Sequence, residues 1–363
     1  MVTISSYPIY FISGFVKRNP KKVVFGCHLE KPAGNVYHFY KHCVAESNSG
    51  YELIWVATSS KSAKYLKEHG FKVVNKYTFS GVVACLTAGH YCYSCYISDI
   101  SFALSRGASS INLWHGTPLK KIESDITTGI YGLRNKYSPI FKLIQPWLFF
   151  KPTKIMASSI YEIECFRTAF LLQEDIFYKT APPRLLDLKQ LDKKGGGWKI
   201  LLAPTFRDGA ALDFHELVDI ETLNLFAADN NIEFYIKAHP SDLSLSSLDL
   251  SDFSNISVLD RLADIYELLK IIDLVVTDYS SIFFDCYYIG LPFLLHWPDV
   301  DSYNDTCREF YFDPYKVAFS LISKDTKELL DNISNWLNGD YPVLQGEFAC
   351  FEKQDKYPLN IFN

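Results

Sequence analysis

The chain has 363 residues, of which 48% are hydrophobic and 21% are charged, as in a folded globular protein. This length exceeds one ordinary hydrophobic core and suits two domains of about 150 to 200 residues each. The formal net charge of -5 argues against nucleic acid as a partner, because binding a phosphate backbone requires a basic surface.

The predicted elements alternate between strand and helix from Val23 onward. In the first half we predict strands at 23–26, 52–57, 71–74, 95–97, 111–114 and 154–157, and helices at 35–43, 61–69 and 159–172. A linker with prolines and three consecutive glycines spans 180–197. In the second half we predict strands at 198–203, 232–236, 256–259, 274–276 and 293–295, and helices at 212–229, 263–270, 282–290 and 324–337. This alternation predicts parallel sheets with helices on both faces.

Nine cysteines, an odd number spread along the chain, indicate free thiols in a reducing compartment. One group, Cys85, His90, Cys92 and Cys95, could bind zinc, but a lone Cys-x-x-Cys pair is a weak signal. The alternative is a buried strand in which cysteine acts as a small apolar residue. We expect no metal site and leave open whether this group binds anything.

Two short strips of sequence combine apolar, aromatic and basic residues. Tyr7–Val16 is followed by four basic residues, and Ser138–Lys151 mixes Trp147 with phenylalanines and lysines. Neither strip is long enough to span a bilayer as a helix. Such strips suit segments that lie on an anionic membrane surface, although packing against a protein core would give the same pattern.

Polar side chains follow several of the predicted strands. His115 comes directly after the strand at 111–114, and histidine has an ordinary pKa that suits proton transfer. The carboxyl ends of parallel strands lie at one edge of a sheet, so the polar groups of the second half are expected to converge there. A helix N-terminus capped by serine adds a phosphate-binding position. These groups are Thr205 with Arg207, Lys237 with His239, and Thr277 with Ser280 and Ser281.

Four of these segments together resemble the CDP-glycerol glycerophosphotransferase family, which includes teichoic-acid and capsule-polymer primases and polymerases. The segments are Trp114–Lys121 (WHGTPLKK), Ala203–Asp208 (APTFRD), Lys237–Pro240 (KAHP) and Thr277–Ser281 (TDYSS) with Phe284 and Asp285. The resemblance implies an α/β fold with two Rossmann-like domains facing across a cleft, the GT-B type. We place an acceptor-side domain at 1–180, a CDP-donor domain at 181–335, and a C-terminal tail at 336–363 that packs back on the first domain.

The resemblance also implies the reaction. The enzyme would transfer glycerol phosphate or a related polyol phosphate from a CDP-linked donor to a hydroxyl of a teichoic-acid-like or capsular polymer, or of a lipid-linked primer, and release CMP. It would need no cofactor and would work in the cytoplasm, peripherally at the inner face of the cell membrane. Two of the family's usual elements differ here, since Ala181–Asp187 and Arg308–Phe310 each depart from the usual residues.

In this mechanism His115 is the general base, and His239 and Arg207 stabilise charge on the transferred phosphoryl group. Donor phosphate binding is assigned to Thr205, Lys237, Thr277, Ser280 and Ser281, and Asp285 meets the ribose or orders its loop. Two alternatives remain open: a GT-B glycosyltransferase that uses a nucleotide sugar, and a non-catalytic scaffold of a polymer assembly complex.

Overall fold

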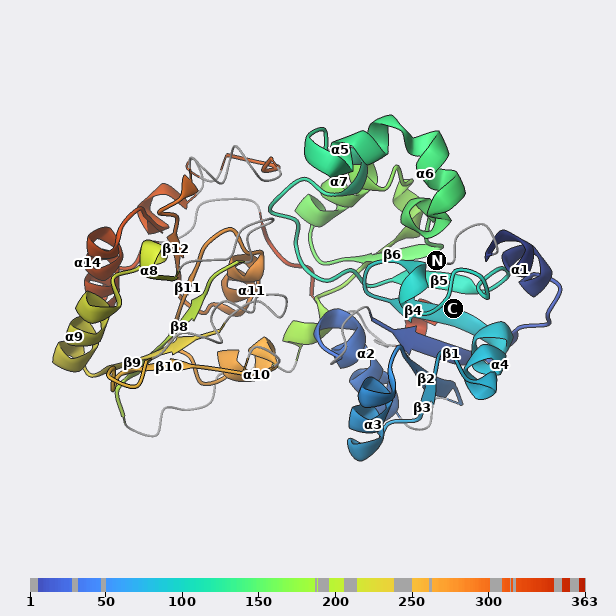
Figure 1. Ribbon diagram of the computed structural model, residues 1–363, viewed down its shortest axis with the longest axis horizontal. Coiled ribbons are helices and arrows are strands. Elements are labelled where there is room, and N and C mark those ends of the chain that lie inside the picture. Colours follow the sequence, from blue (N-terminus) through green and yellow to red (C-terminus); the bar gives the residue numbers. More distant parts are fainter. Residues whose placement is uncertain are drawn as a thin grey trace. The chain divides into compact units, whose positions relative to one another are not determined.

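The computed structural model describes residues 6–27, 32–46, 50–186, 188, 196–205, 214–237, 250–260, 263–300, 309–313, 315, 318–342, 348–352 and 359–362. These residues form two compact units (Figure 1). The first comprises Met1–Gly116, Ile122–Asp187 and Ala349–Asn363, and the second comprises Thr117–Lys121 and Leu188–Phe348.

The first unit is built on a seven-stranded sheet of order β3-β2-β1-β4-β5-β6-β7, in which every pair of neighbours is parallel. Most of its strands bury near-continuous apolar runs, as expected for a sheet covered on both faces. The strands are β1 (Asn19–Gly26), β2 (Glu52–Ala57), β3 (Val73–Asn75), β4 (Ala88–Tyr93), β5 (Ser109–Asn112), β6 (Lys154–Ala157) and β7 (Phe177–Lys179).

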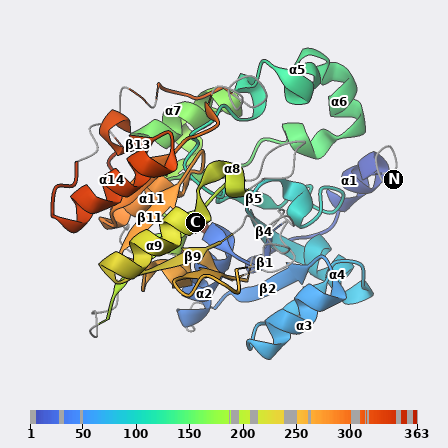
Figure 2. The ribbon, with the colours of Figure 1, turned by 60° about the vertical axis from the view of Figure 1, so that its left-hand side comes forward.

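Helices cover this sheet through separate apolar clusters. One cluster packs α2 and α3 against the sheet together with Phe362, so the C-terminal segment is part of the first unit's core. A second cluster packs α4 and Tyr10 of α1 against the sheet. Figure 2 shows α1 close to α6, and the Tyr7 hydroxyl donates a hydrogen bond to the carbonyl oxygen of Lys142. The helices are α1 (Ser6–Ser13), α2 (Gly34–Ala45), α3 (Ser60–Glu68), α4 (Phe79–Thr87), α5 (Gly129–Lys136), α6 (Ser138–Ile144) and α7 (Ile160–Ala169).

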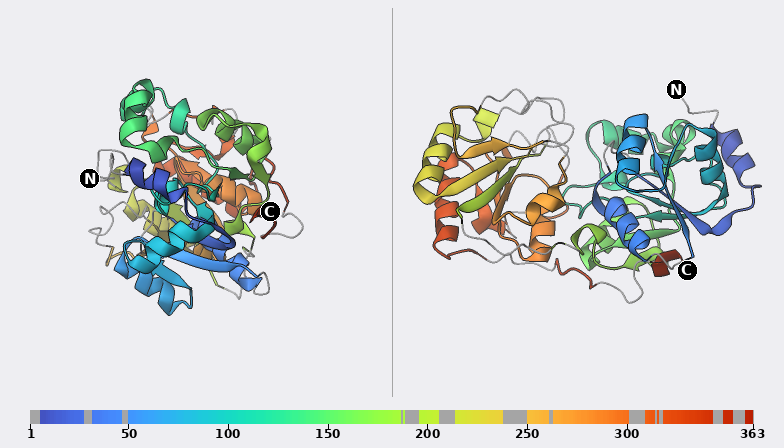
Figure 3. Two further views of the ribbon diagram at one scale, coloured as in Figure 1. Left: turned by 90° about the vertical axis from the view of Figure 1, so that its right-hand side faces the viewer. Right: turned by 90° about the horizontal axis from the view of Figure 1, so that it is seen from below.

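The second unit is built on a six-stranded parallel sheet of order β10-β9-β8-β11-β12-β13. Helices α9 and α14 lie together on one side of it, as Figure 3 shows, and α11 lies on the other side (Figure 1). The strands are β8 (Trp198–Ala203), β9 (Ile232–Ile236), β10 (Ile256–Val258), β11 (Leu274–Thr277), β12 (Phe293–His296) and β13 (Ile322–Ser323). The helices are α8 (Phe214–Leu217), α9 (Ile220–Asn230), α10 (Ile265–Leu269), α11 (Ile282–Ile289) and α14 (Thr326–Leu337).

The predicted fold class, α/β with two Rossmann-like domains, is confirmed by these two parallel sheets. The strand predicted at 95–97 is wrong, since β4 ends at Tyr93 and Ile97–Asp99 form one turn of 3-10 helix. The Asp99 carboxylate causes this turn, because it accepts the backbone N–H groups of Ser94 at 3.2 Å and Cys95 at 2.9 Å. The single helix predicted at 212–229 is two helices, because Asp219 caps the start of α9.

The units differ from the predicted boundaries in three places, the first of which is Thr117–Lys121, a segment of the second unit within the range predicted for the first domain. The first unit continues past residue 180 to Asp187, because Arg184 of the 3-10 turn Pro183–Leu185 is buried there. The second unit continues to Phe348, and the segment that returns to the first unit starts at Ala349. There Cys350 forms an antiparallel backbone bridge with Ser159. In the part of the chain that the structure describes, no helix has the length and apolar character needed to cross a membrane.

Candidate active site

His115 lies three residues beyond the end of β5 in the first unit, with its imidazole exposed to solvent. The two residues that connect it to the strand, Leu113 and Trp114, are buried. The sequence therefore places an imidazole at the carboxyl edge of a parallel sheet, as predicted, although the strand ends at Asn112 and not at Trp114. The buried residues between the strand and His115 fix its position.

The backbone before His115 is held in an unusual conformation. Trp114 has φ +48, in the left-handed region that costs a residue with a side chain about 1–2 kcal/mol. Side-chain amides on two sides stabilise it. The Trp114 N–H donates to Oδ1 of Asn112 at 2.8 Å, and Nδ2 of Asn35 donates to the carbonyl oxygens of Leu113 at 2.8 Å and Trp114 at 3.3 Å.

The imidazole of His115 lies beside a thiol and an indole ring. Its Nδ1 lies 3.2 Å from Sγ of Cys95, and its ring lies 4.3 Å, between centroids, from the ring of Trp114. Burial raises the pKa of the Cys95 thiol, so the sulfur stays neutral at physiological pH. When Nδ1 carries the proton and donates it to the sulfur, Nε2 keeps its lone pair and can accept a proton.

The chain passes from the first unit to the second directly after Gly116. There Lys120 forms an antiparallel bridge with Phe310, and Lys121 forms an ion pair with Glu309. These contacts fix the segment that follows His115 and occupy the ammonium group of Lys121.

In the second unit, several polar groups predicted to bind phosphate lie at the carboxyl ends of β8, β9 and β11. The Thr277 hydroxyl donates to the carbonyl oxygen of Ala203 at 2.7 Å and so links β11 to β8. The Thr205 hydroxyl and N–H both donate to the buried Asp278 carboxylate, the N–H at 2.8 Å. Lys237, 6% exposed, follows β9. The strand ends therefore converge as predicted, but the hydroxyl protons of Thr205 and Thr277 are used to hold the strands together.

Ser280 and Ser281 precede α11 and are half-buried. Ser281 occupies the N-cap position without a side-chain capping bond, and Oγ of Ser280 accepts the N–H of Ile282 at 3.4 Å. Asp285, one turn into the helix, accepts a hydrogen bond from the Tyr266 hydroxyl at 3.0 Å, which ties α11 to α10. This contact is between two helices, and both roles predicted for Asp285, meeting the ribose and ordering its loop, stay predictions.

Two of the predicted catalytic residues, Arg207 and His239, lie outside the described residues. Sequence reasoning missed other residues that shape the site: Asp278, which binds Thr205, and the supports of His115, which are Asn35 and Cys95. The sequence pattern marks Cys95 only as a possible metal ligand or as a small apolar residue of a buried strand. Asp278 is part of the Thr277–Ser281 segment that carries the family resemblance, and this position in a motif is the one sequence signal that points to it.

The four residues considered for zinc do not gather at one point. Cys92 packs in the cluster under α2, whereas Cys85 packs in the cluster under α4, on separate parts of the core. Nε2 of His90 lies 3.1 Å from the carbonyl oxygen of Pro20. Among the described residues, no group of three or more His, Cys, Asp or Glu side chains is arranged to hold a metal ion.

A cavity of about 30 Å³ lies beside the strand ends of the second unit, lined mainly by apolar residues such as Leu202 and Phe214, with Asp278 and His296. It has room for a water molecule and is far too small for a nucleoside.

Comparisons with known proteins agree with the motifs. The family model described as CDP-Glycerol:Poly(glycerophosphate) glycerophosphotransferase matches residues 9–349. A teichoic acid poly(glycerol phosphate) polymerase of Bacillus spizizenii is 25% identical over 96% of this chain and 93% of its own length. A teichoic acid glycerol-phosphate transferase of Staphylococcus aureus is 27% identical over 84% of this chain and 80% of its own.

The fold is also shared with a solved structure, that of the wall teichoic acid polymerase TagF. The TM-score is 0.70 at 21% identity, over 88% of this chain and 81% of that one. Because the family model covers most of its length, the chain belongs to the CDP-Glycerol:Poly(glycerophosphate) glycerophosphotransferase family and is an enzyme that transfers phosphate-linked groups.

Proposed function

We propose that this enzyme transfers glycerol phosphate, or a related polyol phosphate, from a CDP-linked donor to a hydroxyl of a teichoic-acid-like or capsular polymer or its primer. Family membership supports the donor class. The proposal includes other polyol phosphates beside glycerol phosphate because the similar proteins include teichoic acid ribitol-phosphate polymerases of Staphylococcus aureus. The observation that carries the proposal is the exposed His115 imidazole at the carboxyl edge of the first unit's sheet, with its Nδ1 3.2 Å from Sγ of Cys95.

In the proposed reaction, Nε2 of His115 takes the proton of the acceptor hydroxyl as that oxygen attacks the β-phosphorus of the donor. A bond forms between the acceptor oxygen and the β-phosphorus, and the bond from that phosphorus to the bridging oxygen breaks. CMP leaves with the electron pair. A base in hydrogen-bond reach contributes about 10² to 10⁴ in rate.

The second unit would bind the donor phosphates. Ser280 and Ser281 offer hydroxyl groups beside the N-terminus of α11, and Lys237 offers positive charge at the end of β9. Arg207, two residues after Thr205, and His239, two residues after Lys237, would neutralise charge on the transferred phosphoryl group. Thr205 and Thr277 would act indirectly, by keeping the strand ends together. No metal or other cofactor is needed for this reaction.

The donor class is tested by thermal protection. We expect CDP-glycerol or CDP-ribitol at a hundred times its Kd to stabilise the protein by about 2.7 kcal/mol. UDP-sugars at the same concentration should leave the melting temperature unchanged. Protection by a UDP-sugar without protection by either CDP-polyol would contradict the proposal and favour the glycosyltransferase alternative.

We further propose that the first unit docks on an anionic membrane surface through α1, α5 and α6. These helices carry the exposed apolar side chains Ile12, Ile140, Leu143 and Ile130, the last of which is 82% exposed, and Phe15, 90% exposed, lies two residues after the end of α1. The bond from Tyr7 to the Lys142 carbonyl brings α1 and α6 together, so both strips noted in the sequence lie on one surface.

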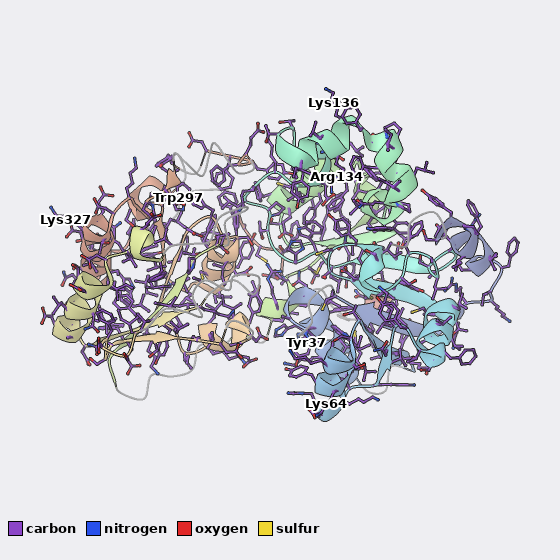
Figure 4. The ribbon with its side chains drawn as sticks, viewed as in Figure 1. Tyr37, Lys64, Arg134, Lys136, Trp297 and Lys327 are labelled. Atoms are coloured by element: carbon purple, nitrogen blue, oxygen red, sulfur yellow. The ribbon has the colours of Figure 1, made fainter. Side chains whose placement is uncertain are left out.

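Charge favours an anionic lipid over an apolar protein partner for this surface. Residues 6–22 and 129–151 contain eight lysines and arginines and no aspartate or glutamate. Figure 4 shows Lys136 pointing away from α5, whereas Arg134 of the same helix points inward, to the Glu123 carboxylate at 3.1 Å. Exposed apolar side chains with basic residues around them suit a lipid interface.

Vesicle sedimentation tests the docking. We expect the protein to pellet with phosphatidylglycerol vesicles at low salt and to be released at high salt, because salt screens the surface attraction. Ile12→Ser with Phe15→Ser should weaken binding at least about tenfold, since both side chains lose apolar area. The control is Leu225→Ser on α9, where the residue is 67% exposed. Equal binding by both variants would contradict the assignment of the surface.

A further inference from the structure

We propose that Asn35 and Arg184 are positioning residues for His115 and act on it through the backbone of Leu113 and Trp114. The proposal rests on the role of His115 as the general base. It assigns a function to Arg184 of the Ala181–Asp187 element, which the reaction as described above does not use.

The contacts form a continuous chain inside the first unit. Nη1 of Arg184 donates to Oδ1 of Asn35 at 2.8 Å, and both side chains are 2% exposed. Because the amide oxygen of Asn35 accepts from arginine, its nitrogen must face the other way, toward the carbonyl oxygens of Leu113 and Trp114. Arg184 therefore fixes the orientation of the amide that holds these two carbonyls.

This support matters because Trp114 has a conformation that it would not keep by itself. A non-glycine residue at φ +48 persists only where surrounding contacts determine it. Without the two hydrogen bonds from Asn35, the peptide units of Leu113 and Trp114 can rotate, and Trp114 can return to the negative φ values that residues with side chains favour. His115, the next residue, would turn with them and lose its contact with Cys95 at 3.2 Å.

The burial of Arg184 separates this role from substrate binding. An arginine in a phosphotransferase commonly binds phosphate oxygens, for which its guanidinium must reach the ligand. Arg184 is enclosed by the protein, with one guanidinium nitrogen bound to Asn35. Its loss should therefore lower kcat and leave the KM for the donor nearly unchanged.

A double-mutant cycle between Asn35→Asp and His115→Ala tests the proposal. Aspartate has almost the shape of asparagine and still accepts from Arg184, but it cannot donate to the two carbonyls and repels them. We expect Asn35→Asp to lower kcat at least about tenfold in the wild-type chain. In the His115→Ala chain, already lowered at least about a hundredfold by loss of the base, it should cost less than about twofold.

A second double-mutant cycle, between Arg184→Met and His115→Ala, tests the proposal if Asn35→Asp does not fold. Arg184→Met should behave as Asn35→Asp does, and Arg184→Lys, which keeps a donor, should recover part of kcat. The control is Lys154→Met, because Lys154 at the start of β6 donates to a backbone carbonyl oxygen in the same unit, that of Ile361 at 2.8 Å, at another place. It should leave kcat within about twofold.

The outcomes separate the inference from the proposed function. Equal losses in the wild-type and His115→Ala chains would mean that Asn35 only stabilises the fold and would overturn the inference. Full turnover in Asn35→Asp and in Arg184→Met, with His115→Ala impaired, would also overturn it while leaving the reaction in place. Full turnover in His115→Ala would remove the base itself, and with it both proposals.

Discussion

His296, at the end of β12, is a buried histidine whose charge state affects stability. Its Nε2 donates to the carbonyl oxygen of Leu217 at 2.7 Å, and its Nδ1 pairs with Oγ of Ser323 at 2.9 Å. Burial lowers the pKa of His296, although the Leu217 carbonyl and the carboxylates of Asp278, Asp325 and Asp299 act in the opposite direction. The folded protein therefore holds this imidazole neutral at a pH where the unfolded chain protonates it.

From this we predict an acid-sensitive step in stability. Below the unfolded pKa of about 6.5 the unfolded chain binds more protons than the folded one, so stability falls as pH falls toward the lower folded pKa. Between pH 7.5 and pH 5.5, the melting temperature of His296→Gln should fall by less than that of the wild type. The control is His69→Gln, at an exposed histidine, whose melting temperature should fall by as much as that of the wild type. Identical losses in wild type and His296→Gln, measured by thermal denaturation, would contradict the assignment.

At the scale of single residues, what could be predicted depended on sequence separation. The position of His115 could be predicted because a buried, mainly apolar run, which begins in β5 and continues to Trp114, ends directly before it. Asn35 and Arg184 could not, because their partners lie 78 and 149 residues away in the chain. The hydroxyls of Thr205 and Thr277 were correctly placed at strand ends, but their acceptors, Asp278 and Ala203, could be known only from the register of β8 and β11.

At the scale of elements, long apolar runs predicted strands well and short mixed segments predicted them poorly. β8, β9 and β11 were found because each is a compact apolar run that ends in polar residues. The helix α4 was missed because its nine residues, FSGVVACLT, are apolar on most sides and have no polar face to give a helical period. The strand before Cys95 was placed too late, because the hydrogen bonds from Ser94 and Cys95 to Asp99 end regular pairing there.

At the scale of the whole molecule, alternation of strands and helices was enough to predict two parallel-sheet units. Their limits were harder to predict, because the chain returns to the first unit at Ala349 and contributes Thr117–Lys121 to the second. These exchanges depend on contacts such as Lys121 with Glu309 and Cys350 with Ser159, which join residues distant in sequence. The family resemblance, carried by four ordered motifs, is confirmed by the match over residues 9–349.

The nucleotide released in turnover tests the central claim most directly, because it reports which bond the whole enzyme breaks. With CDP-glycerol and a hydroxyl acceptor, the account predicts CMP as the product, resolved by chromatography. The mass of the acceptor should increase by one glycerol phosphate for each CMP released. Release of CDP, with an acceptor mass gain that lacks phosphate, would show cleavage on the other side of the linkage and would contradict phosphotransfer.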